Sequence, residues 1–234
     1  MKLLSTTDLE QSTVVANNRM NRERGFIGVN SYQKDLGIDL VQFFHNRIAR
    51  GRPVSWLDIC CGQGRALIEA SQYAMEQQWQ GMLTIEGIDL VGMFDAFDPQ
   101  SHPNLSLIEA SIFDWKAKRS YDLITSVHGL HYLGDKLLCI RYAAQQLKED
   151  GQLLAHLDPN NVIDETHSSI WRQLVKSWKG LGCEFHDRKG LLSIQGRQEL
   201  PDHWEYLGAD DQAGPNHTGQ EAVNSYYQSK ATSA

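Results

Sequence analysis

The sequence predicts an α/β protein built on a mostly parallel sheet with helices on both faces. Short apolar runs alternate along the chain with segments whose apolar residues recur at helical spacing. A parallel strand needs a long crossover to reach the next strand, and a helix is the usual crossover. The chain has 234 residues, of which 41% are hydrophobic and 22% charged, and this suits one domain with a sizeable core.

The first 52 residues are predicted to form an N-terminal helical cap. Residues 5–23 are polar with a short apolar stripe, and residues 38–48 form an amphipathic pattern that ends at Gly51 and Pro53. Residues 53–234 are expected to form the core, with a C-terminal hairpin and a tail. We expect these extra N-terminal helices to pack over the carboxyl end of the sheet.

The core pattern predicts seven strands. Five apolar runs lie at residues 54–59, 83–90, 105–110, 121–127 and 152–157, and helical patterns lie at 65–79, 135–147 and 168–181. Two further strands, 183–195 and 204–208, are separated by a turn too short for a parallel crossover, which predicts an antiparallel hairpin and an antiparallel last strand. Residues 208–219 have the composition of a polar tail, for which Tyr226 and Tyr227 are the natural anchors.

Charge and cysteine usage limit the partners. The formal net charge of −7 disfavours a nucleic-acid substrate, because a polyanion needs a basic surface. No apolar run is long enough to cross a bilayer, and residues 1–10 lack the apolar core of a secretory signal. The four cysteines have no zinc-ligand spacing, so no metal site is expected, and they fit free thiols in the cytoplasm.

The most informative segment is the glycine-rich turn within residues 56–65, WLDICCGQGR. Gly62 and Gly64 allow a ligand to approach the backbone at the start of a helix. The dinucleotide fingerprint requires a small residue three positions after Gly64, and Leu67 stands there. Asp58 would also repel a pyrophosphate. Asp89 ends the next strand, where a carboxylate can accept hydrogen bonds from ribose hydroxyls, so the pattern predicts a nucleoside ligand.

An ordered set of motifs carries a family resemblance. Asp58-x-x-x-Gly62-x-Gly64 is followed by Asp89, then by Tyr121-Asp122-Leu123-Ile124, and then by Leu147-Lys148-Glu149-Asp150-Gly151. This series resembles the class I, Rossmann-like S-adenosylmethionine-dependent methyltransferases. The resemblance implies a three-layer sandwich with a seven-stranded sheet. It also implies S-adenosylmethionine as cofactor and S-adenosylhomocysteine as product.

The resemblance implies a role for each matching residue. The loop from Asp58 to Gly64 would hold the methionine part of the cofactor, and Asp58 suits its ammonium and sulfonium charges. The remaining implied cofactor contacts are Asp89 at the ribose, Leu90, Ser111 and Ile112 at the adenine, Val127 and His128 on the other side of the cofactor, and Tyr32 from the N-terminal segment. The family often has Gly at the position of Cys60 and Asp at the position of Ser111.

The acceptor side of the site is less defined. Methyl transfer from a sulfonium needs a base only where the acceptor holds a proton. His128 follows the fourth strand, and it is expected either to act on the acceptor or to line the pocket without proton transfer. His131 is a second candidate, for which a structural role is favoured. Asp158 precedes Pro159 and is expected to form a turn.

Arg22 and Arg24 could hold a substrate carboxylate, but a solvated helix end is the favoured interpretation. The tail is expected either to close the acceptor pocket or to form a subunit contact, as in a homodimer. The sequence thus predicts transfer of a methyl group to an oxygen or nitrogen of a small molecule, such as a specialised metabolite. A nicotinamide-dependent oxidoreductase and a non-catalytic partner-binding domain are the alternatives.

Overall fold

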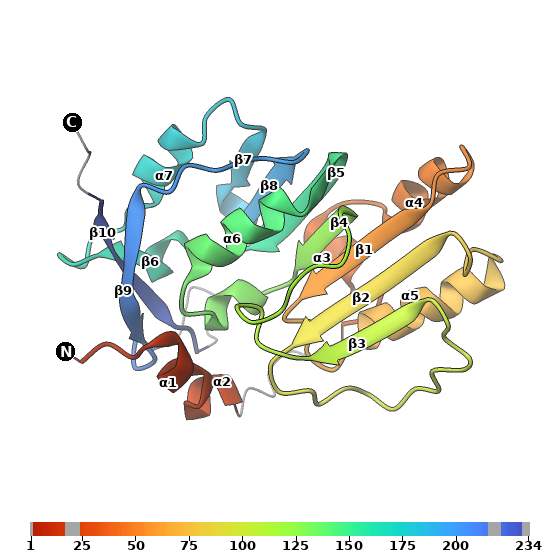
Figure 1. Ribbon diagram of the computed structural model, residues 1–234, viewed down its shortest axis with the longest axis horizontal. Coiled ribbons are helices and arrows are strands. Elements are labelled where there is room, and N and C mark those ends of the chain that lie inside the picture. Colours follow the sequence, from red (N-terminus) through yellow and green to blue (C-terminus); the bar gives the residue numbers. More distant parts are fainter. Residues whose placement is uncertain (1, 17–23, 215–220, 231–234) are drawn as a thin grey trace.

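The computed structural model describes residues 2–16, 24–214 and 221–230. A seven-stranded sheet lies between two layers of helices (Figure 1). Its strand order is β3-β2-β1-β4-β5-β8-β7. The strands are β1 (Val54–Ile59), β2 (Leu83–Asp89), β3 (Leu105–Glu109), β4 (Tyr121–Ser126), β5 (Leu147–His156), β7 (Cys183–His186) and β8 (Leu191–Gln195).

Strands β1 to β5 pair with one another in parallel, whereas β8 is antiparallel to both of its neighbours, β5 and β7. The predicted seven-stranded, mostly parallel, Rossmann-like sheet is therefore confirmed. The chain leaves the central strands β1, β2 and β4 at the same edge, because they run in the same direction. The carboxyl ends of these strands therefore lie side by side at that edge. In open α/β sheets, ligands usually bind there.

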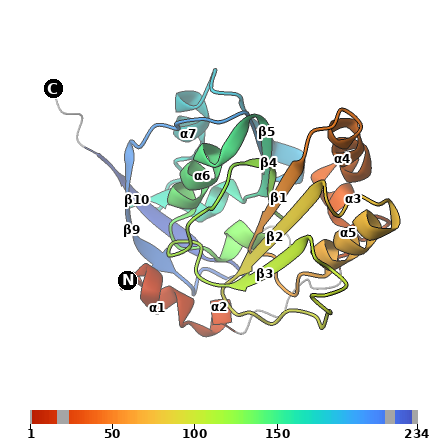
Figure 2. The same ribbon diagram turned by 45° about the vertical axis from the view of Figure 1, so that its right-hand side comes forward.

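The two faces of the sheet carry different helices (Figures 1 and 2). Helices α3 (Tyr32–Leu36), α4 (Leu40–Ile48) and α5 (Arg65–Glu76) cover one face. Helices α6 (Lys136–Gln145) and α7 (Trp171–Ser177) cover the other. Alternation along β1 supplies both layers, since Trp56 packs with the first group and Leu57 with the second. Both side chains are fully buried.

The prediction that residues 183–195 and 204–208 form a C-terminal hairpin is wrong. Residues 183–195 are not one strand: a 3-10 turn, η3 (Asp187–Lys189), separates β7 from β8, and these two strands form the hairpin. Gly190 closes this turn with a φ of +58°, a conformation that glycine adopts without strain. The strand that begins at Trp204 pairs elsewhere.

A second sheet contains that strand, β9 (Trp204–Asp210), which pairs antiparallel with β10 (Asn224–Ser229). The third strand is β6 (Val162–Asp164), which runs parallel to β10. Residues 208–210 of the predicted tail therefore belong to β9, and a further strand, β10, follows the tail. Tyr226 and Tyr227 are 4% and 1% exposed, which confirms them as anchors.

The polar N-terminal segment forms two short helices, α1 (Thr6–Glu10) and α2 (Thr13–Ala16), instead of one helix over residues 5–23. Residues 17–23, and Arg22 with them, lie outside the described residues. Leu4 and Ala209 exchange two backbone hydrogen bonds of 2.8 and 2.9 Å, which fix this segment to β9 (Figure 1). Contrary to the prediction, α4 covers a face of the large sheet and not its carboxyl end.

Lys136 links the second sheet to the core. Its ammonium is fully buried and donates to the carbonyls of Leu133 and Val223 and to the Ser225 hydroxyl, each at 2.8 Å. Burial lowers the pKa of Lys136 to about 7. The first residue of α6 therefore holds the start of β10 through two buried acceptors, the Val223 carbonyl and the Ser225 hydroxyl. Across the described ranges, no helix is long and apolar enough to cross a membrane.

We expect Lys136→Met to lower the free energy of unfolding by about 2–4 kcal/mol, because it leaves buried acceptors without a donor. Urea unfolding followed by circular dichroism would measure the loss. The exposed Lys179 gives the matched control, Lys179→Met, which should change stability by less than about 0.5 kcal/mol. Equal stabilities for the two variants would show that Lys136 does not hold β10.

Candidate active site

The glycine-rich turn joins the end of β1 at Ile59 to the start of α5 at Arg65. Gly62 and Gly64 have φ angles of +58° and +74°. A Cβ added at Gly62 would meet nothing within 4 Å, so this glycine borders open space. Gly64 is the N-cap residue of α5, and because it has no side chain to cap the helix, the first N–H groups of the helix are left for a ligand.

Cys60 also has a positive φ, +58°, which L side chains adopt at a cost. This conformation explains why glycine suits the same position in the resembled family. Burial raises the pKa of the Cys60 and Cys61 thiols. Because the thiol is a weak nucleophile, this pair does not offer a reactive thiolate.

Close packing beneath the turn explains the position of Leu67. A Cβ at Gly87 on β2 would lie 2.4 Å from Leu67 Cδ1, so glycine on the strand makes room for leucine on the helix. Dinucleotide folds place the small residue on the helix instead. Here the small residue, Gly87, lies on the strand and the large one, Leu67, on the helix, and the two elements still pack closely.

Asp89 ties the turn to the next strand. Its carboxylate accepts from the Gly62 N–H at 2.9 Å and from the Val91 N–H at 3.1 Å. Asp89 therefore holds the backbone of the turn at the border of the ligand position.

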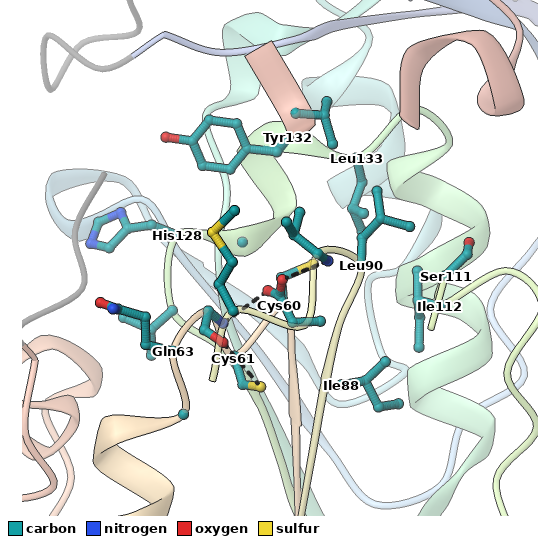
Figure 3. A pocket seen from close by; sticks show the side chains of 18 of the residues that line it. Cys60, Cys61, Gln63, Ile88, Leu90, Ser111, Ile112, His128, Tyr132 and Leu133 are labelled. Carbon is teal, nitrogen blue, oxygen red and sulfur yellow. Dashed lines mark hydrogen bonds between the residues drawn. The ribbon is translucent and has the colours of Figure 1, made fainter. Parts of the chain in front are cut away.

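These residues border a cavity of about 810 Å³ at the carboxyl ends of the strands (Figure 3). The predicted site residues that line it are Tyr32, Cys60, Gly62, Gly64, Asp89, Leu90, Ser111, Ile112, Val127 and His128. In Figure 3, His128 and Gln63 lie on one side and Ser111 and Ile112 on the other. Asp58 and His131 are not among the lining residues.

Asp58 lies below the turn and is fully buried. It accepts hydrogen bonds from the Tyr32 hydroxyl at 2.8 Å and the Thr125 hydroxyl at 2.5 Å. Burial raises the pKa of Asp58 to about 7, and these bonds only partly oppose that effect. These two bonds join β1 to β4 and to α3, and Asp58 does not line the cavity, so its predicted charge contact with the ligand stays a prediction.

His128 belongs to a group of rings at the ends of β4 and β5. It stacks on His156 with ring centroids 4.2 Å apart, and His131 lies 5.6 Å away. His128 Nε2 is 3.9 Å from the Asp35 carboxylate. Burial lowers the pKa of His156 to about 4, so this ring is neutral at physiological pH. His131 is 1% exposed, and its carbonyl accepts from the Val223 N–H.

Several cavity residues were missed or assigned differently from sequence. Arg24 pairs with Asp35, has a side chain only 15% exposed and lines the cavity, so the favoured interpretation of a solvated helix end is wrong for it. Glu10 and Tyr132 also line the cavity. No local pattern points to them, because the chain brings them there through tertiary packing. Asp158 forms the expected turn, accepting from the Asn160 N–H at 2.9 Å.

We expect the Asp58→Asn variant to gain stability relative to the natural protein as pH rises from about 4 to 7. The folded chain keeps the Asp58 proton up to pH about 7, whereas the unfolded chain releases it near pH 4. The free energy of unfolding contributed by Asp58 therefore falls through this window, by roughly 3–4 kcal/mol, and is constant above it.

Urea unfolding at pH 4.5, 6 and 8 would measure this difference. Asp114→Asn removes an exposed carboxylate and is the matched control, which should follow the natural protein. If the profiles of Asp58→Asn and the natural protein ran parallel, the raised pKa of Asp58 would be refuted.

Solved structures offer matches at low identity. An amino pentose methyltransferase from Micromonospora echinaspora, CalS10, is 16% identical with a TM-score of 0.38, over 54% of this chain and 50% of that chain. Coclaurine N-methyltransferase is 14% identical with a TM-score of 0.41, over 66% and 48%. The [4+2]-cyclase SpnF is 13% identical with a TM-score of 0.44, over 66% and 61%. The chain thus spans about half the length of the first two proteins.

No curated protein matches the sequence closely enough to count as a relative. A family model described as a methyltransferase domain matches residues 30–211, which include the glycine-rich turn, Asp89 and His128. This match covers most of the chain, and the chain therefore belongs to the methyltransferase-domain family.

Proposed function

We propose that this protein transfers a methyl group from S-adenosylmethionine to an oxygen or nitrogen atom of a small molecule. The observation that carries the proposal is the cavity at the strand ends, where Asp89 holds the N–H of Gly62 and a helix begins without a side-chain cap. Family membership supports the reaction type. The net charge of −7 favours a small acceptor over a nucleic acid.

The residues present fit this cofactor. The open space at Gly62 is a cradle that a side chain would fill, so the backbone can meet a ligand there. The cavity offers Arg24 and the uncapped start of α5 to a carboxylate, and Asp89 to ribose hydroxyls. Leu90 and Ile112 offer apolar surface to a base. Asp58 would act from below, by holding the turn in place through β1.

The cofactor supplies a methyl group already activated on a sulfonium, so the chain's task is to orient the acceptor and exclude water. Arg24 lines the cavity and forms an ion pair with Asp35 behind it. His128 stands beside this pair, with its Nε2 3.9 Å from the Asp35 carboxylate. A hydroxyl acceptor would give its proton to the neutral His128 ring as its oxygen attacks. The neutral His156 ring keeps His128 in place by stacking.

Calorimetric titration tests the cofactor assignment directly. We expect S-adenosylhomocysteine to bind saturably with one site per chain, and NAD not to bind. NAD is the appropriate control because Leu67 stands where its binding loop needs a small residue. Binding of NAD alone would replace the proposal with an oxidoreductase. Failure of both ligands would favour a partner-binding domain.

We expect His128→Gln to lower kcat for a hydroxyl acceptor by roughly 10²–10⁴-fold, the usual contribution of a positioned base. Affinity for S-adenosylhomocysteine should stay within about twofold, because the proposed role concerns the acceptor. A methyl-labelled cofactor and a panel of phenols and amines would identify an acceptor for the assay. His203→Gln changes an exposed histidine and is the matched control. If kcat of His128→Gln stays near that of the control, proton transfer at His128 is excluded.

A further inference from the structure

The proposed function assigns a role to one carboxylate that lines the cavity and none to another. Among the described residues that line it, the carboxylates are Asp89 and Glu10. Asp89 stands at the end of β2 and is assigned to the ribose. Glu10 ends the short helix α1, far from the glycine-rich turn in sequence, and has no role in the site so far.

Glu10 is paired with Ser111 across the cavity wall. The Ser111 hydroxyl donates to Glu10 Oε1 at 2.6 Å and accepts from the Phe113 N–H at 3.2 Å. The single proton of this hydroxyl is thus directed to Glu10. Its oxygen has already accepted one bond, which makes Ser111 a weak partner for a further donor.

Glu10 is the stronger acceptor of the pair. Its carboxylate receives one hydrogen bond from Ser111, and carboxylates have about four lone-pair sites. Hydrogen bonds to a charged acceptor are about twice as strong as neutral ones. The Glu10–Ser111 pair therefore presents a negative acceptor to any N–H donor at this end of the cavity.

The surroundings of the pair suit a flat, mostly apolar ring with a polar edge. Leu9, Leu90, Ile112 and Leu133 also line the cavity, and Figure 3 shows Ser111 beside Ile112, away from His128. Adenine has apolar faces and an exocyclic amino group on its edge. A donor of that kind is what a carboxylate at the end of an apolar slot recognises.

The second sheet fixes Glu10 in this position. Leu9 is 1% exposed and packs against Ala209 and Val223, next to the backbone bonds between Leu4 and Ala209. Ala209 on β9 and Val223, which directly precedes β10, thereby hold α1 at the second sheet. The carboxylate does not depend on the short helix alone for its placement.

We propose that Glu10, supported by Ser111, accepts a hydrogen bond from the exocyclic amino group of adenine and so determines which base the site takes. This inference rests on the proposed function, since it needs an adenosyl cofactor in the cavity. It gives the N-terminal helix and the second sheet a part in cofactor selection.

The test compares two ligands that differ only at that amino group. S-adenosylhomocysteine is titrated beside its 6-deamino analogue, in which hydrogen replaces the amino group. We expect the natural protein to bind the amino form roughly 10–100-fold more tightly, the range for a hydrogen bond to a charged group. Glu10→Ala should reduce this ratio to about one to three, and Glu10→Gln should give an intermediate ratio.

Asp8→Ala removes an exposed carboxylate from the same helix and should keep the natural ratio. Unfolding midpoints of the variants would show that α1 is still in place. An unchanged ratio in Glu10→Ala, or a ratio near one in the natural protein, would overturn the assignment and leave the proposed function standing. Absence of S-adenosylhomocysteine binding to the natural protein would overturn both.

Discussion

The hydrogen bond from the Gly62 N–H to Asp89 is the interaction on which the site depends. It joins the turn after β1 to the end of β2 and fixes the backbone in a conformation that glycine tolerates. Leu67 can then pack onto Gly87, and α5 begins with its first N–H groups directed to the cavity. Without this bond, the strand ends would still be neighbours, but the backbone of the turn that borders the cavity would have no fixed conformation.

A second layer of support lies under that turn. Asp58 joins β1 to Thr125 on β4 and to Tyr32 on α3, and Trp56 donates its indole N–H to the same threonine at 2.9 Å. This network sits where water does not reach, so each group needs a partner within the protein. The acid that the sequence motif singled out therefore acts on the architecture of the turn, and Asp89 is the acid that faces the cavity.

Elements that depend on local sequence signals could be predicted, whereas pairings between distant segments could not. Strand β1 and the start of α5 were predictable because apolar runs and a glycine turn are local signals. The partner of β9 was not, because it lies beyond the polar stretch that begins near residue 211, and nothing local marks β10 as a strand. The same distinction holds in the site. Gly62, Gly64 and Asp89 follow from motif spacing, whereas Glu10 and Arg24 reach the cavity from segments that precede the sheet.

The bond between Leu4 and Ala209 has a consequence for synthesis of the protein. On the ribosome, the strands that form the floor of the cavity emerge long before residue 209, and they can pair as soon as β4 is complete. The wall that contains Leu9 and Glu10 has nothing to rest on until β9 and Val223 have emerged. The nascent chain thus carries a half-built cavity for much of its elongation, and the closing contact, with its large sequence separation, is also the costliest in chain entropy.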